Sequence, residues 1–149
     1  MTDHVPLPDR RTWMGLLARA RPEDLIRLHP DGLPDHHLLR GPETGTVMVR
    51  GRIGATGGPF NLGEMTVTRC SIRLEDGIIG HAVVQGRNKA HARHAAVLDA
   101  LMQTPQAERL AETVLKPIAS AEADRRTALA RRAAATKVEF FTLVRGEDA

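Results

Sequence analysis

The residues best suited to chemistry form a basic cluster near the middle of the chain. Gly86, Arg87, Lys89 and His91 stand where a β-prone run gives way to a helical pattern that Asn88 is placed to cap. The first turn of a helix has unpaired N–H groups and a positive dipole end, so cations there are unfavourable unless an anion compensates them. We therefore predict that Gly86, Arg87, Lys89 and His91 bind a phosphate-like anion. The alternative is a solvated basic patch that contacts the carboxylates of a partner.

Other catalytic or metal-binding arrangements are not visible in the sequence. His91 and His94 are three residues apart, but no nearby carboxylate or cysteine completes a metal ligand set. We expect one of these histidines to pack against the sheet and the other to be exposed, and we expect His81 in the core or in an interface. Asp99, alone on an apolar helix, is expected to pair with an arginine. Without a nucleophile–base pair, paired carboxylates or a dinucleotide fingerprint, the sequence predicts no catalytic residue, no metal and no cofactor held by this chain alone.

The composition describes one globular chain without a membrane span. The 149 residues are 42% hydrophobic and 26% charged, which suits a folded protein rather than a disordered one. Cys70 is the single cysteine, so an internal disulfide is excluded and a reducing, cytoplasmic location is expected. No apolar run approaches the roughly 20 residues that cross a membrane. Aromatic residues make up only 3%, which makes a basic nucleic-acid-binding module the weakest functional alternative.

The periodicity of apolar residues predicts an α+β fold: an antiparallel β-meander of three to five strands with helices packed against it and a C-terminal helical arm. Helices are expected at residues 9–20, 22–28, 89–103, 104–115 and 121–136, and strands at residues 36–41, 46–53, 60–74 and 78–84. A turn is expected at residues 41–45. Pro117 is expected to end one helix and Ser120 to cap the next. The small residues Gly80, Ala82 and Gly86 on one strand face favour a closely packed helix.

The chain beyond residue 118 is predicted to depend on a partner. Residues 1–118 form the expected core domain, and residues 119–149 form the expected subunit-contact arm. The helix of this arm has Leu129 as its one large apolar side chain, and residues 138–144 are apolar and β-prone. Such elements bury little against their own domain, and an exposed apolar strand needs something to pair with it. We therefore predict Leu129, Phe140, Phe141 and Arg145 as contacts with another subunit.

Five stretches of the chain are informative together. They are residues 11–14 (RTWM), 42–45 (PETG), 86–92 (GRNKAHA), 99–102 (DALM) and 140–146 (FFTLVRG). In this order and combination they resemble the PhnG family, the G subunit of the carbon–phosphorus lyase machinery of phosphonate metabolism. The chain departs from that pattern at Asn88, where aspartate is expected, and at Arg93, where glutamate is expected. The second departure makes this corner of the molecule more basic.

The resemblance implies an accessory subunit of a cytoplasmic complex with H, I and J partners. In that complex ATP and methylphosphonate give ribose 1-methylphosphonate 5-triphosphate with release of adenine. The I subunit is expected to carry the nucleosidase chemistry, and the J subunit is expected to hold an iron–sulfur cluster. The implied role of this chain is to support the I-type subunit through its arm. Direct binding of a triphosphate or phosphonate by the corner from Gly86 to His94 is the alternative.

Overall fold

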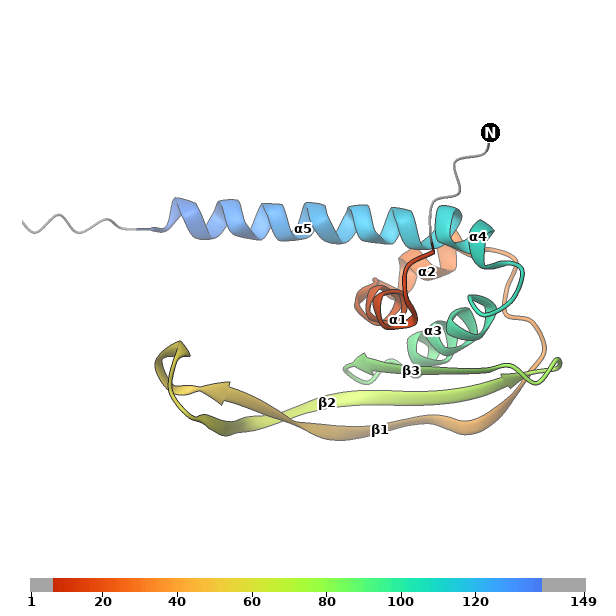
Figure 1. Ribbon diagram of the computed structural model, residues 1–149, viewed down its shortest axis with the longest axis horizontal. Helices are drawn as coiled ribbons and strands as arrows, with labels where there is room; N and C mark the ends of the chain where they lie inside the picture. The colour runs from red at the N-terminus through yellow and green to blue at the C-terminus, as the bar shows by residue number, and fades with distance from the viewer. Residues whose placement is uncertain (1–6, 138–149) are drawn as a thin grey trace, which may run out of the picture.

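The computed structural model describes residues 7–137, which form an α+β fold (Figure 1). One antiparallel sheet has the strand order β1-β2-β3, and the helices lie on one side of it. The strands are β1 (His36–Arg52), β2 (Pro59–Leu74) and β3 (Ile79–Gln85), with a short 3₁₀ turn η1 (Ile53–Ala55) between the first two. The helices are α1 (Arg10–Arg19), α2 (Pro22–Leu28), α3 (Lys89–Leu101), α4 (Ala107–Leu110), the π turn η2 (Ala111–Leu115) and α5 (Lys116–Ala135). The predicted meander with packed helices is confirmed.

Two helices begin at the side chains that the sequence marks as caps. The carboxylate of Asp9 accepts a hydrogen bond from the backbone N–H of Thr12 at 2.8 Å, at the start of α1. The side-chain oxygen of Asn88 accepts one from the N–H of His91 at 2.9 Å, at the start of α3. Each bond satisfies a backbone donor that the first helical turn leaves free. The capping predictions for both helices are therefore confirmed.

Strand β1 is longer than the sequence indicates, because the turn expected at residues 41–45 does not form. The strand runs for 17 residues, and its pairing with β2 shifts between Leu38 and Arg40 and again between Arg40 and Glu43. These irregularities accommodate Gly41 and Pro42 inside the strand. A proline is tolerated there because β1 is an edge strand. No strand pairs with its open side, so a missing N–H on that side removes no hydrogen bond from the sheet. The turn prediction was wrong, and the two expected strands are one.

The outer half of the β1–β2 hairpin extends beyond the rest of the sheet. Strand β3 pairs only with the stretch of β2 from Val67 to Arg73. The remainder of the hairpin is a two-stranded ribbon that projects past α1 and α3 (Figure 1). It exposes Met48, Phe60 and Leu62, which are 55%, 40% and 66% accessible. A two-stranded ribbon is marginally stable alone, so its apolar side chains suit contact with another molecule.

The core lies between the sheet and α3, and it depends on small side chains at their seam. Gly80 of β3 faces α3 so closely that an added Cβ would lie 2.0 Å from the carbonyl oxygen of Ala96. Ala82 of the same strand and Ala92 of the helix are also buried. Only glycine fits at the closest point, and the alanines keep the two elements near each other along their length. The prediction that small residues favour a closely packed helix is confirmed for Gly80 and Ala82, whereas Gly86 lies beyond the end of β3 and has open space beside it.

The carboxylate of Asp99 joins three elements inside this core. It is fully buried on α3 and accepts four hydrogen bonds. Arg10 of α1 donates through Nε at 3.1 Å and Nη2 at 2.7 Å, and the indole N–H of Trp13 donates at 2.8 Å. The backbone N–H of His81 in β3 donates at 2.9 Å. The expected pairing of Asp99 with an arginine is confirmed, and the bond raises the pKa of Arg10.

The C-terminal helix continues through Pro117, where the sequence predicted a stop. The π turn η2 ends immediately before α5, and Pro117 lies in the first turn of α5. In a regular α-helix the proline ring would clash with the carbonyl four residues back, which here is that of Thr113 within the wider π turn. Ser120 accordingly lies inside α5 and is not a cap. The stop and the cap were both wrong, because a π turn leaves no signature in the composition.

Helix α5 leaves the core soon after it begins. Ile118 is its buried residue, and every described side chain from Arg126 to Lys137 is exposed. In Figure 1 the helix extends beyond α1 on the same side of the molecule as the projecting ribbon. The predicted C-terminal helical arm is confirmed for the described part of the chain, and its contact with a partner stays a prediction.

We expect Asp99→Asn to lower the free energy of unfolding by about 2–4 kcal/mol. The substitution removes the charge that compensates Arg10 and replaces one acceptor oxygen with an NH2 donor that faces other N–H donors, but Arg10 is itself partly exposed. Urea unfolding followed by circular dichroism measures the change. The matched control Asp31→Asn alters an exposed aspartate 3.8 Å from Arg109, and its effect should stay below about 1 kcal/mol. Equal effects of the two substitutions would contradict the role assigned to Asp99.

Candidate functional site

The turn from β3 into α3 is held by Gly86 and two threonines of β2. Gly86 has a φ of +90°, a conformation that favours glycine. Its N–H donates to the carbonyl of Thr66 at 2.9 Å, and its carbonyl accepts from the hydroxyl of Thr68 at 2.8 Å. Thr68 is fully buried. The backbone at the start of α3 is therefore fixed in place by the neighbouring strand.

Arg87 and Lys89 project from this fixed turn into solvent. Both are exposed, and the first turn of α3 contains no acidic residue. Within residues 7–137 the structure gives neither side chain an ion pair. A guanidinium offers a planar pair of donors and an ammonium a mobile charge, so the two can hold a phosphate or a carboxylate. Gly86, Arg87 and Lys89 thus lie together at one surface corner.

His91 does not lie with them. Its ring is buried between α1 and α3, and Nε2 is 2.9 Å from the carbonyl oxygen of Leu17. The side chain therefore holds two helices together and is turned away from the exposed corner. Of the four residues that the sequence groups into an anion site, three are brought together at the surface and the fourth is part of the core.

A buried pair of histidines lies next to the contact between α1 and α3. His29, which follows α2, and His94 of α3 have ring centroids 5.5 Å apart, and both side chains are buried. His29 Nδ1 and His94 Nε2 have no hydrogen-bond partner in the described structure. The expectation that either His91 or His94 would be exposed was wrong. The signal was the helical stripe that runs from His91 and His94 to Leu98 and Leu101, all of which are buried.

Burial keeps these two rings neutral. Burial is the largest cause, and together with the smaller effects of the neighbouring His29 and His91 it lowers the pKa of His94 from 6.5 to about 4. Burial also lowers the pKa of His29, against a smaller opposing effect of Asp31. Protonating either ring inside the core costs free energy, because no carboxylate accepts a hydrogen bond from it in the described residues.

His81 lies on the exposed side of the sheet, so the expectation of a core position was wrong, and the alternative of an interface position stays a prediction. Its Nδ1 is 2.8 Å from the hydroxyl of Ser71 on the neighbouring strand. This is a nucleophile and a base at contact distance, a pair that sequence reasoning missed because the strand register brings the two together. In the described part of the chain no carboxylate orients the other ring nitrogen, and the pair lies on an open strand surface. We therefore assign it no catalytic role.

The described residues offer no further cofactor site. Residues 7–137 contain no group of three or more histidine, cysteine, aspartate or glutamate side chains placed to hold a metal ion. Cys70 is buried in β2, and burial raises the pKa of its thiol. None of the helices between residues 7 and 137 has the length and apolar character needed to span a bilayer.

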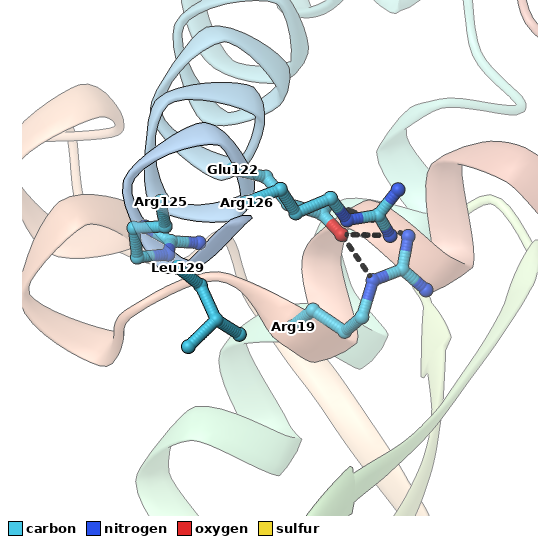
Figure 2. A pocket seen from close by; sticks show the side chains of 5 residues that line it. All are labelled: Arg19, Glu122, Arg125, Arg126 and Leu129. Carbon is cyan, nitrogen blue, oxygen red and sulfur yellow. Dashed lines mark hydrogen bonds and ion pairs between the residues drawn. The ribbon is translucent and has the colours of Figure 1, made fainter. Parts of the chain in front are cut away.

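The base of the arm is a second cluster of charged side chains (Figure 2). Glu122 Oε1 of α5 accepts hydrogen bonds from Arg19 Nε of α1 at 2.8 Å and from Arg126 Nη2 at 2.6 Å. These bonds, with that of Arg19 the larger cause, lower the pKa of Glu122. Leu129, one turn beyond Arg126 on α5, is 68% exposed beside a hollow of about 250 Å³. Phe140, Phe141 and Arg145, the other predicted partner contacts, lie outside the described residues.

These features define a class of protein. The chain is a small α+β protein with a packed apolar core, an exposed basic corner and two projecting elements, the ribbon and α5. Projecting elements with exposed apolar side chains are typical of subunits that assemble with other chains.

Comparison with known proteins identifies the family. The family described as phosphonate metabolism protein PhnG matches residues 8–146. A protein of Rhizobium meliloti (strain 1021) is 47% identical over 152 residues, which cover 99% of this chain and 96% of the relative. That relative is named alpha-D-ribose 1-methylphosphonate 5-triphosphate synthase subunit PhnG. The chain belongs to the PhnG family of phosphonate metabolism, as the resemblance of the five stretches indicates.

We expect acid to destabilise the fold through the buried histidines. The folded pKa of His94 is about 4, so the unfolded chain takes up a proton between about pH 6.5 and pH 4 that the folded chain does not. The stability is complete above pH 6.5 and falls as the pH drops toward 4, by up to about 3 kcal/mol. Urea unfolding at about pH 7.5, 6 and 5 measures how the free energy of unfolding changes with pH.

The substitution His94→Gln removes the titrating ring and should flatten the profile. The control His37→Gln changes an exposed histidine and should leave the profile as in the wild type. A profile of His94→Gln that overlays that of the wild type would show that another group causes the acid sensitivity.

Proposed function

We propose that this chain is the G subunit of an alpha-D-ribose 1-methylphosphonate 5-triphosphate synthase and acts there as an accessory subunit. The observation that carries the proposal is the 47% identity to the Rhizobium meliloti subunit over nearly the whole of both chains. In the proposed reaction a phosphonate displaces adenine from ATP, and the product is ribose 1-methylphosphonate 5-triphosphate. ATP is therefore a substrate of the complex and not a cofactor of this chain.

The accessory role follows from what the described residues can do. The exposed Ser71–His81 pair lacks an orienting carboxylate among the described residues, and the buried histidines face the core. We assign the chemistry to partner subunits, with the I-type subunit as the one that displaces adenine and the H and J subunits as further partners. This chain's contribution is to hold the assembly together, in the cytoplasm.

The arm supplies the contact in this proposal. None of the described residues from Ala119 to Lys137 is buried, although residues 119–135 are helical. Most of the stability of a helix in a protein comes from packing of an apolar face, and a helix that buries no face gains little from its own domain. Packing of Leu129 and its neighbours on the I-type subunit would supply the missing stabilisation.

Truncation after Ala119 is expected to abolish complex formation with the I-type subunit while the core stays folded. The truncation removes no buried residue among those described, so circular dichroism and thermal unfolding should report an intact core. Co-expression of the two chains followed by size-exclusion chromatography measures assembly. In the full-length chain, Leu129→Asp should weaken the complex, whereas Ile26→Asp, at a residue of similar exposure on α2, should not. Undiminished assembly of the truncated chain would overturn the accessory role of the arm.

Direct binding of a triphosphate or phosphonate at the α3 corner is the second candidate function. The observation that favours it is the exposure of Arg87 and Lys89 at a helix start without an acidic residue. In this case Arg87→Ala combined with Lys89→Ala would leave assembly intact and lower the activity of the complex and its affinity for ATP. Unchanged activity of the complex with this double variant would remove the candidate.

A further inference from the structure

The outer part of α5 has an uneven distribution of charge. Residues 125–137 include Arg125, Arg126, Arg131, Arg132 and Lys137 but no aspartate or glutamate. Glu122 lies at the base of this segment, and its carboxylate is shared between Arg19 and Arg126 (Figure 2). One carboxylate therefore compensates part of the charge of two guanidiniums, and the segment beyond it remains cationic.

Leu129 lies among these arginines on the surface of α5. Helical spacing places Arg125 four residues before it, Arg126 three residues before it and Arg132 three residues after it, all neighbours on the helix surface. Figure 2 shows Leu129 beside the hollow that Arg19, Arg125 and Arg126 also line. An exposed apolar side chain ringed by arginines has the character of an interface centre, because arginine combines apolar contact with charge-assisted hydrogen bonds.

We propose that Leu129, Arg125, Arg126 and Arg132 form one docking surface, the arginine collar, whose occupant is a partner protein with an apolar groove rimmed by carboxylates. This inference rests on the proposed function, since it assigns the chemistry of the surface that the arm contacts. Leu129 enters the groove, and the guanidiniums pair with aspartate or glutamate side chains at its rim. Charge complementarity of this kind fixes the orientation of the arm and speeds its association.

The surface suits a protein better than a phosphate ligand or a nucleic acid. A phosphate bound by the arginines would leave the 68% exposed Leu129 without a partner. Residues 119–137 contain no aromatic side chain on which a base could stack. The hollow is also open, with Glu122 already bonded to two arginines, so it is not a closed pocket for a small anion.

Charge reversal in the full-length chain tests the collar. Arg125→Glu with Arg132→Glu changes two side chains for which the described structure gives no ion pair and leaves the Arg19–Glu122–Arg126 cluster in place. Affinity for the remaining synthase subunits, purified together without this chain, is measured by calorimetry at low and physiological salt. We expect the affinity to fall about a hundredfold and its salt dependence to weaken.

Two matched variants separate charge from general damage. Arg125→Lys with Arg132→Lys keeps the charge and should bind within about threefold of the wild type. Arg11→Glu with Arg21→Glu makes the same change in net charge on exposed residues of the core and should also bind like the wild type. The single variant Arg125→Lys also supplies an amine, which a carbodiimide should couple to an aspartate or glutamate of a partner subunit in the assembled complex.

The outcomes distinguish the collar from the proposed function. Wild-type affinity of the Arg125→Glu and Arg132→Glu variant would overturn the collar, and the proposed function would still stand if truncation after Ala119 prevents assembly. If neither the charge-reversal variant nor the truncated chain lost assembly, the collar and the proposed function would both be overturned. Arginine-dependent binding of a labelled oligonucleotide or of ATP to the isolated chain, without an effect on assembly, would assign the surface to a different ligand and also overturn the collar.

Discussion

The buried carboxylate of Asp99 is the interaction on which the core depends. Its partners Arg10 and Trp13 are 89 and 86 residues away in the sequence, and a third partner is the backbone N–H of His81 in β3. A buried charge is tolerable only when its donors are all in place, so α1, α3 and β3 must adopt one relative position. The close approach at Gly80 brings β3 near enough to α3 for this arrangement, and the bonds to Asp99 then fix α1 across them.

The position of α1 in turn sets the direction of the arm. Arg19, at the end of α1, bonds to Glu122 of α5, and Ile118 anchors the beginning of α5 in the core. Beyond these contacts the helix lies free of the core, as does the outer half of the hairpin. The molecule thus combines a core with one specified geometry and two extensions whose side chains are left for other contacts. This division suits an accessory subunit, in which the core orients surfaces that bind partners.

Sequence reasoning predicted the features that depend on local chemistry. The caps Asp9 and Asn88 and the start of α2 at Pro22 follow from backbone groups within one helical turn. The exposure of Leu129 also followed, because an alanine- and arginine-rich helix has no face to bury. The Gly41–Pro42 segment and Pro117 were misjudged, since an edge strand and a π turn absorb residues that usually break structure. His91 was misplaced because only the packing of α1 on α3 shows which way its ring points.

Hydrogen exchange of the isolated chain and of the assembled synthase tests the central claim most directly. The claim is that a fixed core carries an arm that becomes stable on a partner. We predict that amides of α3 around Asp99 exchange slowly in both states, and that amides from Ser120 to Ala135 exchange quickly in the isolated chain and at least about tenfold more slowly in the complex. Unchanged exchange of α5 in an intact complex would contradict the account.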